Sequence, residues 1–455
     1  MIPERSTFTA WLYLAIAVST IVDFFQPQPI LENVTSAMIV LFLVFEFGNL
    51  PRAQQIAGLV LIVVGIAGAA SSSDWQDVLL DGIARSRAFL LLFFAVSWLQ
   101  FPVSRSPALR AVRQAIINQP SGRRFLFLSF GVHVLGSVLN LAGLSLLTVM
   151  VEEQKDKLMR RRLSLALMQG FTSASLWSPF YIGMVVVLVA LPSLSWQQVA
   201  PGGAALAAVL MVSSWAYDRV MLRQRGIDDG VRKKFIISKS DMLRAFVIMA
   251  LLMSSVMILA EIASTSIPVT LGLVGPIFSA VWYWAIQRSS PNALRHTGAM
   301  VVQVVAGSCM LRNEAMMFVA ANVFGVGLAS AIPAGDLSAA VNNLICCADL
   351  KLLAIILTFL LSAMMGLHPV IIVIFFAAVL PPASIGLSDW TVGLIYLACW
   401  GLSTQISPVS GTNLFMSRVA KVPPHIISWR WAPPSTFLGA FVVYIIVITI
   451  RHTTM

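Results

Sequence analysis

Two polar stretches interrupt long apolar segments, and both contain residue types that bind small ions. The first, residues 172–179, reads Thr-Ser-Ala-Ser-Leu-Trp-Ser-Pro, and the second, residues 403–413, includes Pro408 and Gly411. A proline inside a helix removes a backbone hydrogen bond and clashes with the preceding turn, so we expect both helices to break. The N-terminus of the half-helix after a break suits an anion, whereas carbonyl groups freed at the break can coordinate sodium.

The side chains at the two breaks are therefore the candidate substrate- or ion-binding residues. They are Thr172, Ser173, Ser175, Ser178, Ser403, Thr404, Ser407, Ser410, Thr412 and Asn413. The alternative is a packing kink, in which Ser and Thr side chains bond back to their own helix. Two related breaks at corresponding positions favour binding over a kink.

Four ionisable residues in or beside apolar segments are candidates for proton transfer or gating: His133, His368, Arg312 and Glu314. A charge inside a membrane span is costly unless it is paired or faces a cavity. The spacing of Arg312 and Glu314 does not favour an intrahelical pair. The simpler alternatives are histidines that are buried polar residues with satisfied hydrogen bonds, and an Arg-Asn-Glu triplet near a membrane interface between two short helices.

The composition indicates which elements hold these residues. Hydrophobic residues make up 58% of the 455 residues and charged residues only 11%, against about 25% charged residues in soluble domains. Continuous apolar runs of about 20 residues predict membrane-spanning helices and exclude a barrel. The net charge of +11 lies in a few loops, which is typical of cytoplasmic loops and gives no reason to expect nucleic acid as a partner.

The four cysteines show no metal-ligand spacing and are expected to be packing residues: Cys309, Cys346, Cys347 and Cys399. We therefore expect no bound metal or cofactor, apart from a coupling Na⁺. The first apolar run, residues 7–25, is longer than the apolar core of a signal peptide and is expected to remain as the first helix.

The distribution of Lys and Arg predicts the topology. It places the N-terminus in the cytoplasm, with the bacterial inner membrane as the expected location. The apolar stretch 125–151 lies between two basic segments, and one crossing cannot join two cytoplasmic loops, so we predict a re-entrant hairpin there. A second hairpin is predicted at 351–382. The predicted fold is all-α, with about eleven transmembrane helices and two hairpins.

An internal repeat relates the two hairpin regions. Gly-Val-His at 131–133 corresponds to Gly-Leu-His at 366–368, and two further short matches near the broken helices follow in the same order. The first copy starts inside and the second outside, which is typical of the inverted repeats of secondary transporters. The predicted organisation is an extra N-terminal helix (1–35), a first unit (36–240) with a broken helix at 163–191, and a second unit (241–455) with a broken helix at 390–416.

This pattern resembles the ion transporter superfamily, which includes divalent anion:sodium symporters, citrate carriers and the large membrane subunits of carboxylate carriers that use a binding protein. The segment 406–413, Ile-Ser-Pro-Val-Ser-Gly-Thr-Asn, looks like the second broken helix of that superfamily, and 366–369, Gly-Leu-His-Pro, looks like a hairpin tip. The resemblance implies elevator-type transport of a small anion, most simply a carboxylate, coupled to Na⁺ or H⁺. It also implies a scaffold that can dimerise and, in some branches, a soluble binding or accessory partner.

Two other function classes stay open at this point. A membrane-embedded glycan polymerase or lipid-linked transferase usually needs a large outer loop with catalytic residues, and the outer loops here are short. A non-transporting membrane component of an envelope complex is the third class. Neither rival predicts an inverted repeat, so the sequence favours a transporter that is not an enzyme, with a small anion and the lipid bilayer as its partners.

Overall fold

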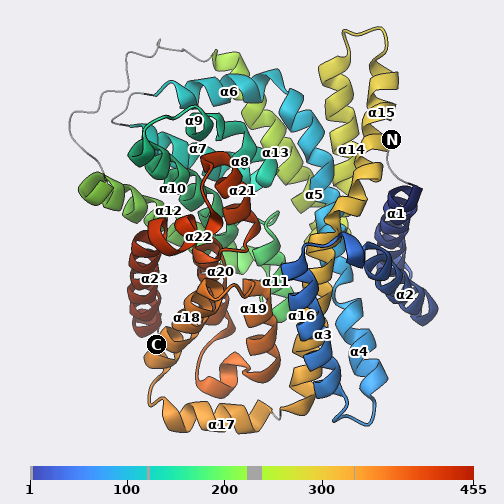
Figure 1. The fold of residues 1–455 in the computed structure, drawn as a ribbon, viewed down its shortest axis with the longest axis vertical. Helices are drawn as coiled ribbons and strands as arrows, with labels where there is room; N and C mark the ends of the chain where they lie inside the picture. The colour runs from blue at the N-terminus through green and yellow to red at the C-terminus, as the bar shows by residue number, and fades with distance from the viewer. Residues whose placement is uncertain (1–3, 120–122, 223–237, 333, 455) are drawn as a thin grey trace. The chain divides into compact units, whose positions relative to one another are not determined.

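The structure is a computed structural model that describes residues 4–119, 123–222, 238–332 and 334–454. The described residues form helices, turns and loops without a strand (Figure 1). Nine of the described helices are long and apolar enough to cross a membrane, or ten if one bent pair counts as a single span. The all-α polytopic membrane fold is thus confirmed, with slightly fewer full-length spans in this part of the chain than the eleven expected. Most of the basic loop after residue 219 lies outside the described residues.

The chain divides into two compact units that exchange segments. Unit 1 comprises Met1–Ser106, Met249–Leu337 and Ile374–Val379, and unit 2 comprises Pro107–Ile248, Ser338–Val373 and Leu380–Met455. Three helices have residues in both units: α13 (Lys239–Ile262), α17 (Ala334–Leu344) and α19 (Pro369–Val379). These units are defined by how closely their residues pack and not by sequence repetition. The predicted repeat boundaries near residues 36 and 241 therefore stay a prediction.

Unit 1 is a bundle of long helices that pack closely through small residues. Its helices are α1 (Glu4–Phe25), α2 (Pro29–Glu46), α3 (Arg52–Ala69), α4 (Trp75–Ala84), α5 (Arg87–Arg105), α14 (Ile267–Gln287), α15 (Ala293–Gly307) and α16 (Arg312–Ala331). A Cβ on Gly327 would lie 2.0 Å from the Gly65 carbonyl oxygen. Small residues of this kind let membrane helices approach backbone to backbone, here α3 and α16.

Unit 2 holds the hairpin and both broken helices that the sequence singles out. Its first part contains α6 (Pro107–Ile117), α7 (Arg124–Leu139), α8 (Leu141–Leu147), α9 (Val149–Glu152), α10 (Lys157–Ser173), η2 (Ala174–Leu176), α11 (Ile182–Ala190), α12 (Trp196–Tyr217) and η3 (Asp218–Leu222). Its second part contains α18 (Ala348–Met364), α20 (Asp389–Ile406), α21 (Gly411–Ala420), α22 (Pro424–Ile426), η6 (Ile427–Trp431) and α23 (Pro433–Thr454).

The first predicted hairpin is a helix–turn–helix with its turn at Asn140. This residue has a positive φ of 52° with ψ −137°, a backbone conformation uncommon for residues other than Gly, and its side chain accepts a hydrogen bond from the backbone N–H of Leu141. The two arms are in close contact, because a Cβ on Gly143 in α8 would lie 2.5 Å from the Leu135 carbonyl oxygen in α7. The turn therefore lies well beyond the Gly-Val-His segment.

The second predicted hairpin begins as the sequence indicates, with a break after α18. Gly366 has φ 94°, and the N–H groups of Gly366 and Leu367 donate to the carbonyls of Ala363 and Ser362. This is a Schellman cap, and Pro369 then starts α19. The second arm is divided between the units, since the last part of α19 packs in unit 1, where Ile374 contacts Gly325.

One glycine fixes the contact between the first hairpin and the first broken helix. A Cβ on Gly170 in α10 would lie 2.1 Å from the Ser129 carbonyl oxygen in α7. The Gly170→Ala variant should therefore be destabilised by about 1–3 kcal/mol, because backbone atoms must separate. Gly298→Ala is the control, since Gly298 is a helical glycine with no atom within 4 Å of the added Cβ. The measurement is the midpoint of thermal unfolding in detergent, and equal midpoints for the two variants would contradict the packing argument.

Candidate functional site

The second broken helix has a non-helical link, residues 407–410, between α20 and α21. Ser410 is extended (φ −64°, ψ 145°) and caps α21, because its Oγ accepts a hydrogen bond from the Asn413 N–H at 3.1 Å. The same hydroxyl donates to the Thr404 carbonyl oxygen at 2.6 Å. The Asn413 Nδ2 donates across the break to the Ser407 carbonyl oxygen at 2.9 Å. Side chains of Ser410 and Asn413 thus stabilise the non-helical conformation of the link through hydrogen bonds to the end of α20 and to the link itself.

Two oxygens at this break have no hydrogen-bond partner in the structure. Ser407 is 1% exposed and Asn413 is fully buried, yet neither Ser407 Oγ nor Asn413 Oδ1 forms a hydrogen bond. Buried polar atoms are nearly always partnered, so each exception calls for an explanation such as a ligand or a bound ion. The N–H groups at the start of α21 lie beside them, where the helix dipole is positive.

The first broken helix has its link at residues 177–181, between η2 and α11. Ser178 is fully buried, and its Oγ donates to the Ser137 carbonyl oxygen in α7 and accepts from the Phe180 N–H at 3.2 Å. Ser175 Oγ donates to the Thr172 carbonyl oxygen at 2.7 Å. All hydroxyls of this break therefore face protein partners, unlike Ser407 at the second break.

His133 is enclosed by the first broken helix. The Trp177 Nε1–H donates to His133 Nε2 at 3.0 Å, and His133 Nδ1 lies 2.9 Å from Ser173 Oγ. Because Nε2 accepts, the ring proton lies on Nδ1, and the imidazole is neutral in this arrangement. A role in proton transfer would require the Trp177 hydrogen bond to break, so the geometry agrees with a satisfied buried histidine.

His368 lies in a comparable aromatic setting in the second half of the chain. Its ring contacts Trp400 of α20 edge to face, with centroids 5.6 Å apart, and its Nδ1 accepts from the Val370 N–H at 3.3 Å. Trp400 also packs against Gly183 of α11. Each candidate histidine thus packs on a tryptophan of a broken helix.

The two broken helices meet inside unit 2. Gln405 Nε2 in α20 donates to Thr172 Oγ1 in α10 at 2.8 Å, and a Cβ on Gly401 would lie 2.6 Å from the Thr172 carbonyl oxygen. Ser403 and Thr404 instead bond to carbonyl oxygens, those of Phe359 at 3.3 Å and Gly401 at 2.8 Å. Of the predicted residues, Thr172 and Ser173 thus lie beside α20, and Thr412 is buried at the start of α21.

Arg312 and Glu314 belong to unit 1, whereas both breaks belong to unit 2. Arg312 begins α16 after the short turn η4 (Ser308–Leu311), and its guanidinium pairs with Glu46 of α2 at 3.3 Å. Glu46 is 1% exposed and also accepts from the Thr9 hydroxyl at 2.5 Å. The partner of Arg312 is thus a carboxylate on another helix, as the spacing argument allows.

This pair gives a stability prediction. Glu46→Ala leaves a partly buried guanidinium without its carboxylate, so we expect a loss of about 3 kcal/mol and a clearly lower unfolding midpoint. The exposed pair of Arg85 and Asp81, whose side chains are 54% and 46% exposed, is the control, because Asp81→Ala should change stability by less than about 1 kcal/mol. Similar midpoint shifts for the two variants would show that the Glu46 pair contributes no more than a surface pair.

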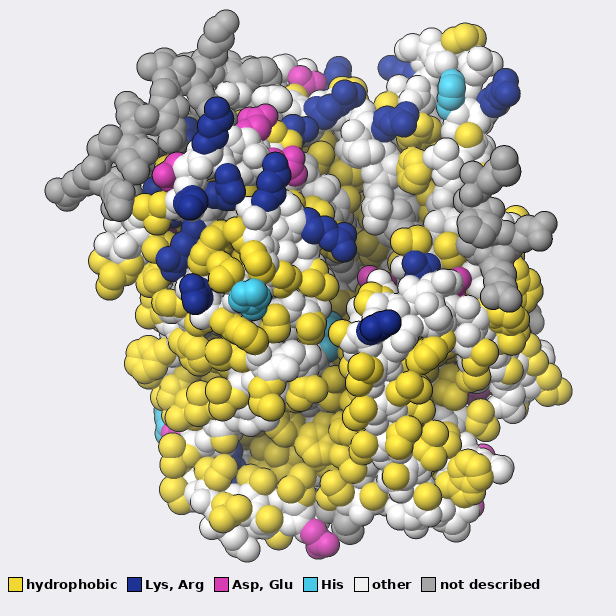
Figure 2. Space-filling view, viewed as in Figure 1, with side chains coloured by type: hydrophobic (Ala, Val, Ile, Leu, Met, Phe, Trp, Pro, Cys, Tyr) yellow, Lys and Arg dark blue, Asp and Glu magenta, His cyan; other side chains and the backbone are white. Residues whose placement is uncertain are grey.

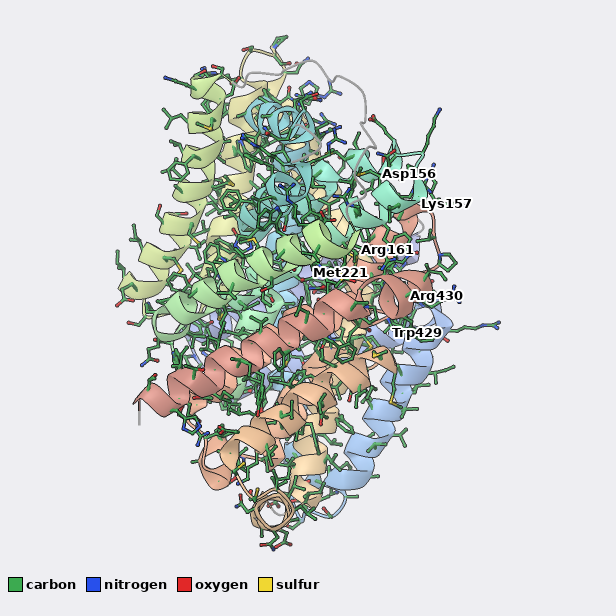
Figure 3. All side chains as sticks on the ribbon, turned by 90° about the vertical axis from the view of Figure 1, so that its left-hand side faces the viewer. Asp156, Lys157, Arg161, Met221, Trp429 and Arg430 are labelled. Carbon is green, nitrogen blue, oxygen red and sulfur yellow. The ribbon has the colours of Figure 1, made fainter. Side chains whose placement is uncertain are left out.

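Sequence reasoning missed a second buried pair. Arg162 near the start of α10 binds Asp218 of η3 bidentately, with Nε–Oδ1 at 2.7 Å and Nη2–Oδ2 at 2.8 Å. Lys157, Arg161 and Arg430 lie on the side of unit 2 shown in Figure 3. Figure 2 shows Lys and Arg side chains gathered over the region of α6, α9 and the start of α10, with hydrophobic side chains elsewhere on the visible face of unit 2. This distribution is typical of a membrane interface.

Sequence reasoning also missed two buried glutamines, Gln169 and Gln405, which are each 5% exposed. Gln405 follows Thr404 directly and Gln169 lies three positions before Thr172, and this proximity to predicted site residues was the only available signal. No cluster of potential metal ligands occurs among the described residues.

Comparison with known proteins shows a likeness to solved structures. No family model matches the chain, and no curated protein matches it. Among solved structures, the crystal structure of the YdaH transporter of Alcanivorax borkumensis, described as having an unusual topology, is similar over 97% of this chain and 98% of its own, with a TM-score of 0.50 and 14% identity. A likeness at this identity concerns the fold: the chain is a polytopic membrane protein with a transporter-like fold.

Proposed function

We propose that the protein is a secondary active transporter of a small anion, most simply a carboxylate, coupled to Na⁺ or H⁺. The observation that carries this proposal is the second break, where the unpartnered oxygens of Ser407 and Asn413 lie beside the positive end of α21. The N–H groups of that end suit a carboxylate, and the free oxygens suit a cation. One break therefore offers complementary groups to an anion and its coupling ion.

The composition of unit 2 supports an elevator-type mechanism. The first hairpin, both broken helices and α18 pack into one compact unit, while α1 to α5 and α14 to α16 form the other. Unit 2 would be the moving part and unit 1 the scaffold, which can dimerise. The likeness to a transporter structure and the resemblance to the ion transporter superfamily support the same assignment. The N-terminus would face the cytoplasm of a bacterial inner membrane, and a soluble binding or accessory protein would fit this scheme.

The proposal is tested by the thermal stability of the purified full-length protein with a panel of small anions, while sodium, potassium and pH are varied. A ligand that binds only the folded state raises the unfolding midpoint by mass action. We expect stabilisation by a carboxylate that depends on sodium or on pH, which also identifies the coupling ion. A folded sample that responds to no anion would contradict the proposal.

A further inference from the structure

Unit 2 holds a small polar crevice that is not lined by residues of the Ser407–Asn413 break. It is lined by residues of α10, η2, α12, α20 and α23, with Gln169, Thr172, Gln405 and Ser435 as the polar side chains that matter here. Its free volume is about 10 Å³, which is room for about one water-sized occupant. A carboxylate substrate does not fit in this space.

One oxygen in the crevice has no partner. Gln169 is 5% exposed, and its Nε2 donates to Ser435 Oγ at 2.7 Å, but its Oε1 forms no hydrogen bond. Two neighbouring donors are directed elsewhere: Gln405 Nε2 to Thr172 Oγ1, and the Ser435 hydroxyl to the Ala432 carbonyl oxygen at 3.0 Å. An occupant that brings a hydrogen-bond donor or a positive charge would satisfy Gln169 Oε1.

The surroundings favour a positive charge. Gln169 and Thr172 lie in the last turns of α10, and Gly401 and Gln405 lie in the last turns of α20. The C-terminal end of a helix carries partial negative charge, so two such ends face the crevice and attract a cation. Since every lining residue is uncharged, a divalent ion, which prefers carboxylates, is disfavoured.

We propose that this crevice binds a monovalent cation, Na⁺, through neutral oxygens, with Gln169 Oε1 as the anchoring ligand. Thr172 Oγ1 and Gln405 Oε1, which already belong to the same hydrogen-bond network, supply further oxygens. The inference rests on the proposed function, because it adds an ion site to a cation-coupled transporter. It places that site where the two broken helices meet, separate from the anion at the second break.

The test is direct Na⁺ binding to the purified full-length protein by isothermal titration calorimetry, with K⁺ and choline as comparison cations. Gln169→Leu removes the oxygen at similar volume and should weaken Na⁺ binding by at least about tenfold. Gln169→Glu restores an oxygen with a charge and should bind Na⁺ at least as tightly as the unmodified protein. Gln198→Leu is the matched control, because its side chain caps α12 outside the crevice, and it should leave Na⁺ binding unchanged.

Three results would overturn the inference: no Na⁺ binding by the unmodified protein, Gln169→Leu that binds Na⁺ normally, or Gln169→Glu that fails to retain binding. In the first two cases the crevice holds water or serves packing only. If Gln169→Leu does not fold, Gln169→Glu alone decides, since a folded Gln169→Glu protein without Na⁺ binding contradicts the assignment. Failure of the proposed function looks different: Na⁺ would still bind through Gln169, while no anion would stabilise the protein.

Discussion

Asn413→Ala is expected to lower uptake into proteoliposomes by about 10- to 100-fold, measured with the anion that stabilises the unmodified protein. The side chain does two things at the break: its Nδ2 holds the Ser407 carbonyl oxygen at 2.9 Å, and its Oδ1 is free for a ligand. Alanine removes both, so the link between α20 and α21 loses its cross-connection and the site loses an oxygen. Hydrogen bonds to charged groups are strong enough for a loss of this size.

A second variant at the same position tests whether the substrate is an anion. Asn413→Asp keeps the shape but adds a negative charge beside the start of α21, so it should bind the anion even more weakly than the alanine variant. Asn322→Ala is the control, because Asn322 is 2% exposed and its Nδ2 donates to the Phe318 carbonyl oxygen at 2.8 Å within unit 1. Uptake by a folded Asn413→Ala protein at the unmodified rate would exclude this residue from the site.

Asp218→Ala is expected to destabilise the protein by about 3–5 kcal/mol, the largest stability effect predicted for this chain. The side chains of Arg162 and Asp218 are only 10% and 3% exposed, so both charges of this bidentate pair are largely shielded from water. Removing the carboxylate therefore leaves a buried guanidinium without compensation. The measurement is the unfolding midpoint in detergent, together with the yield of folded protein.

A double variant separates loss of the pair from loss of packing. Arg162→Met with Asp218→Leu replaces both charges by apolar groups, which often restores stability at buried pairs. Asp241→Ala is the control, because its partner Arg244 is 71% exposed. If the double variant is as unstable as Asp218→Ala, the region depends on the shape and hydrogen bonds of the pair and not on charge compensation.

The helices and their breaks were predictable because their causes are local. Pro408 and Gly411 mark the link after α20, and Gly366 with Pro369 marks the end of α18, where a positive φ is required. The turn of the first hairpin was harder to predict, because it depends on a positive φ at Asn140 within an otherwise apolar run. The inverted relation of the two halves stays a prediction.

The partners of the polar residues were not predictable from one sequence. Arg312 pairs with Glu46, which is 266 positions away, and Gln169 bonds to Ser435, also 266 positions away. Such contacts depend on how helices pack in three dimensions, and neither periodicity nor charge patterning encodes them. The sequence indicated that Arg312 needed a partner, because a charge inside an apolar segment is costly. Gln169 gave no comparable signal, because its side chain is uncharged.

The positions of the native cysteines allow the membrane topology to be measured without introducing new ones. Cys346 and Cys347 are exposed in the short connection between α17 and α18, whereas Cys309 and Cys399 are buried. A thiol reagent that cannot cross the bilayer would therefore react with the intact protein at one loop, from one side of the membrane only. Labelling of sealed cells with such a reagent reads out the orientation of that loop, and hence of every helix counted from it, without an engineered tag.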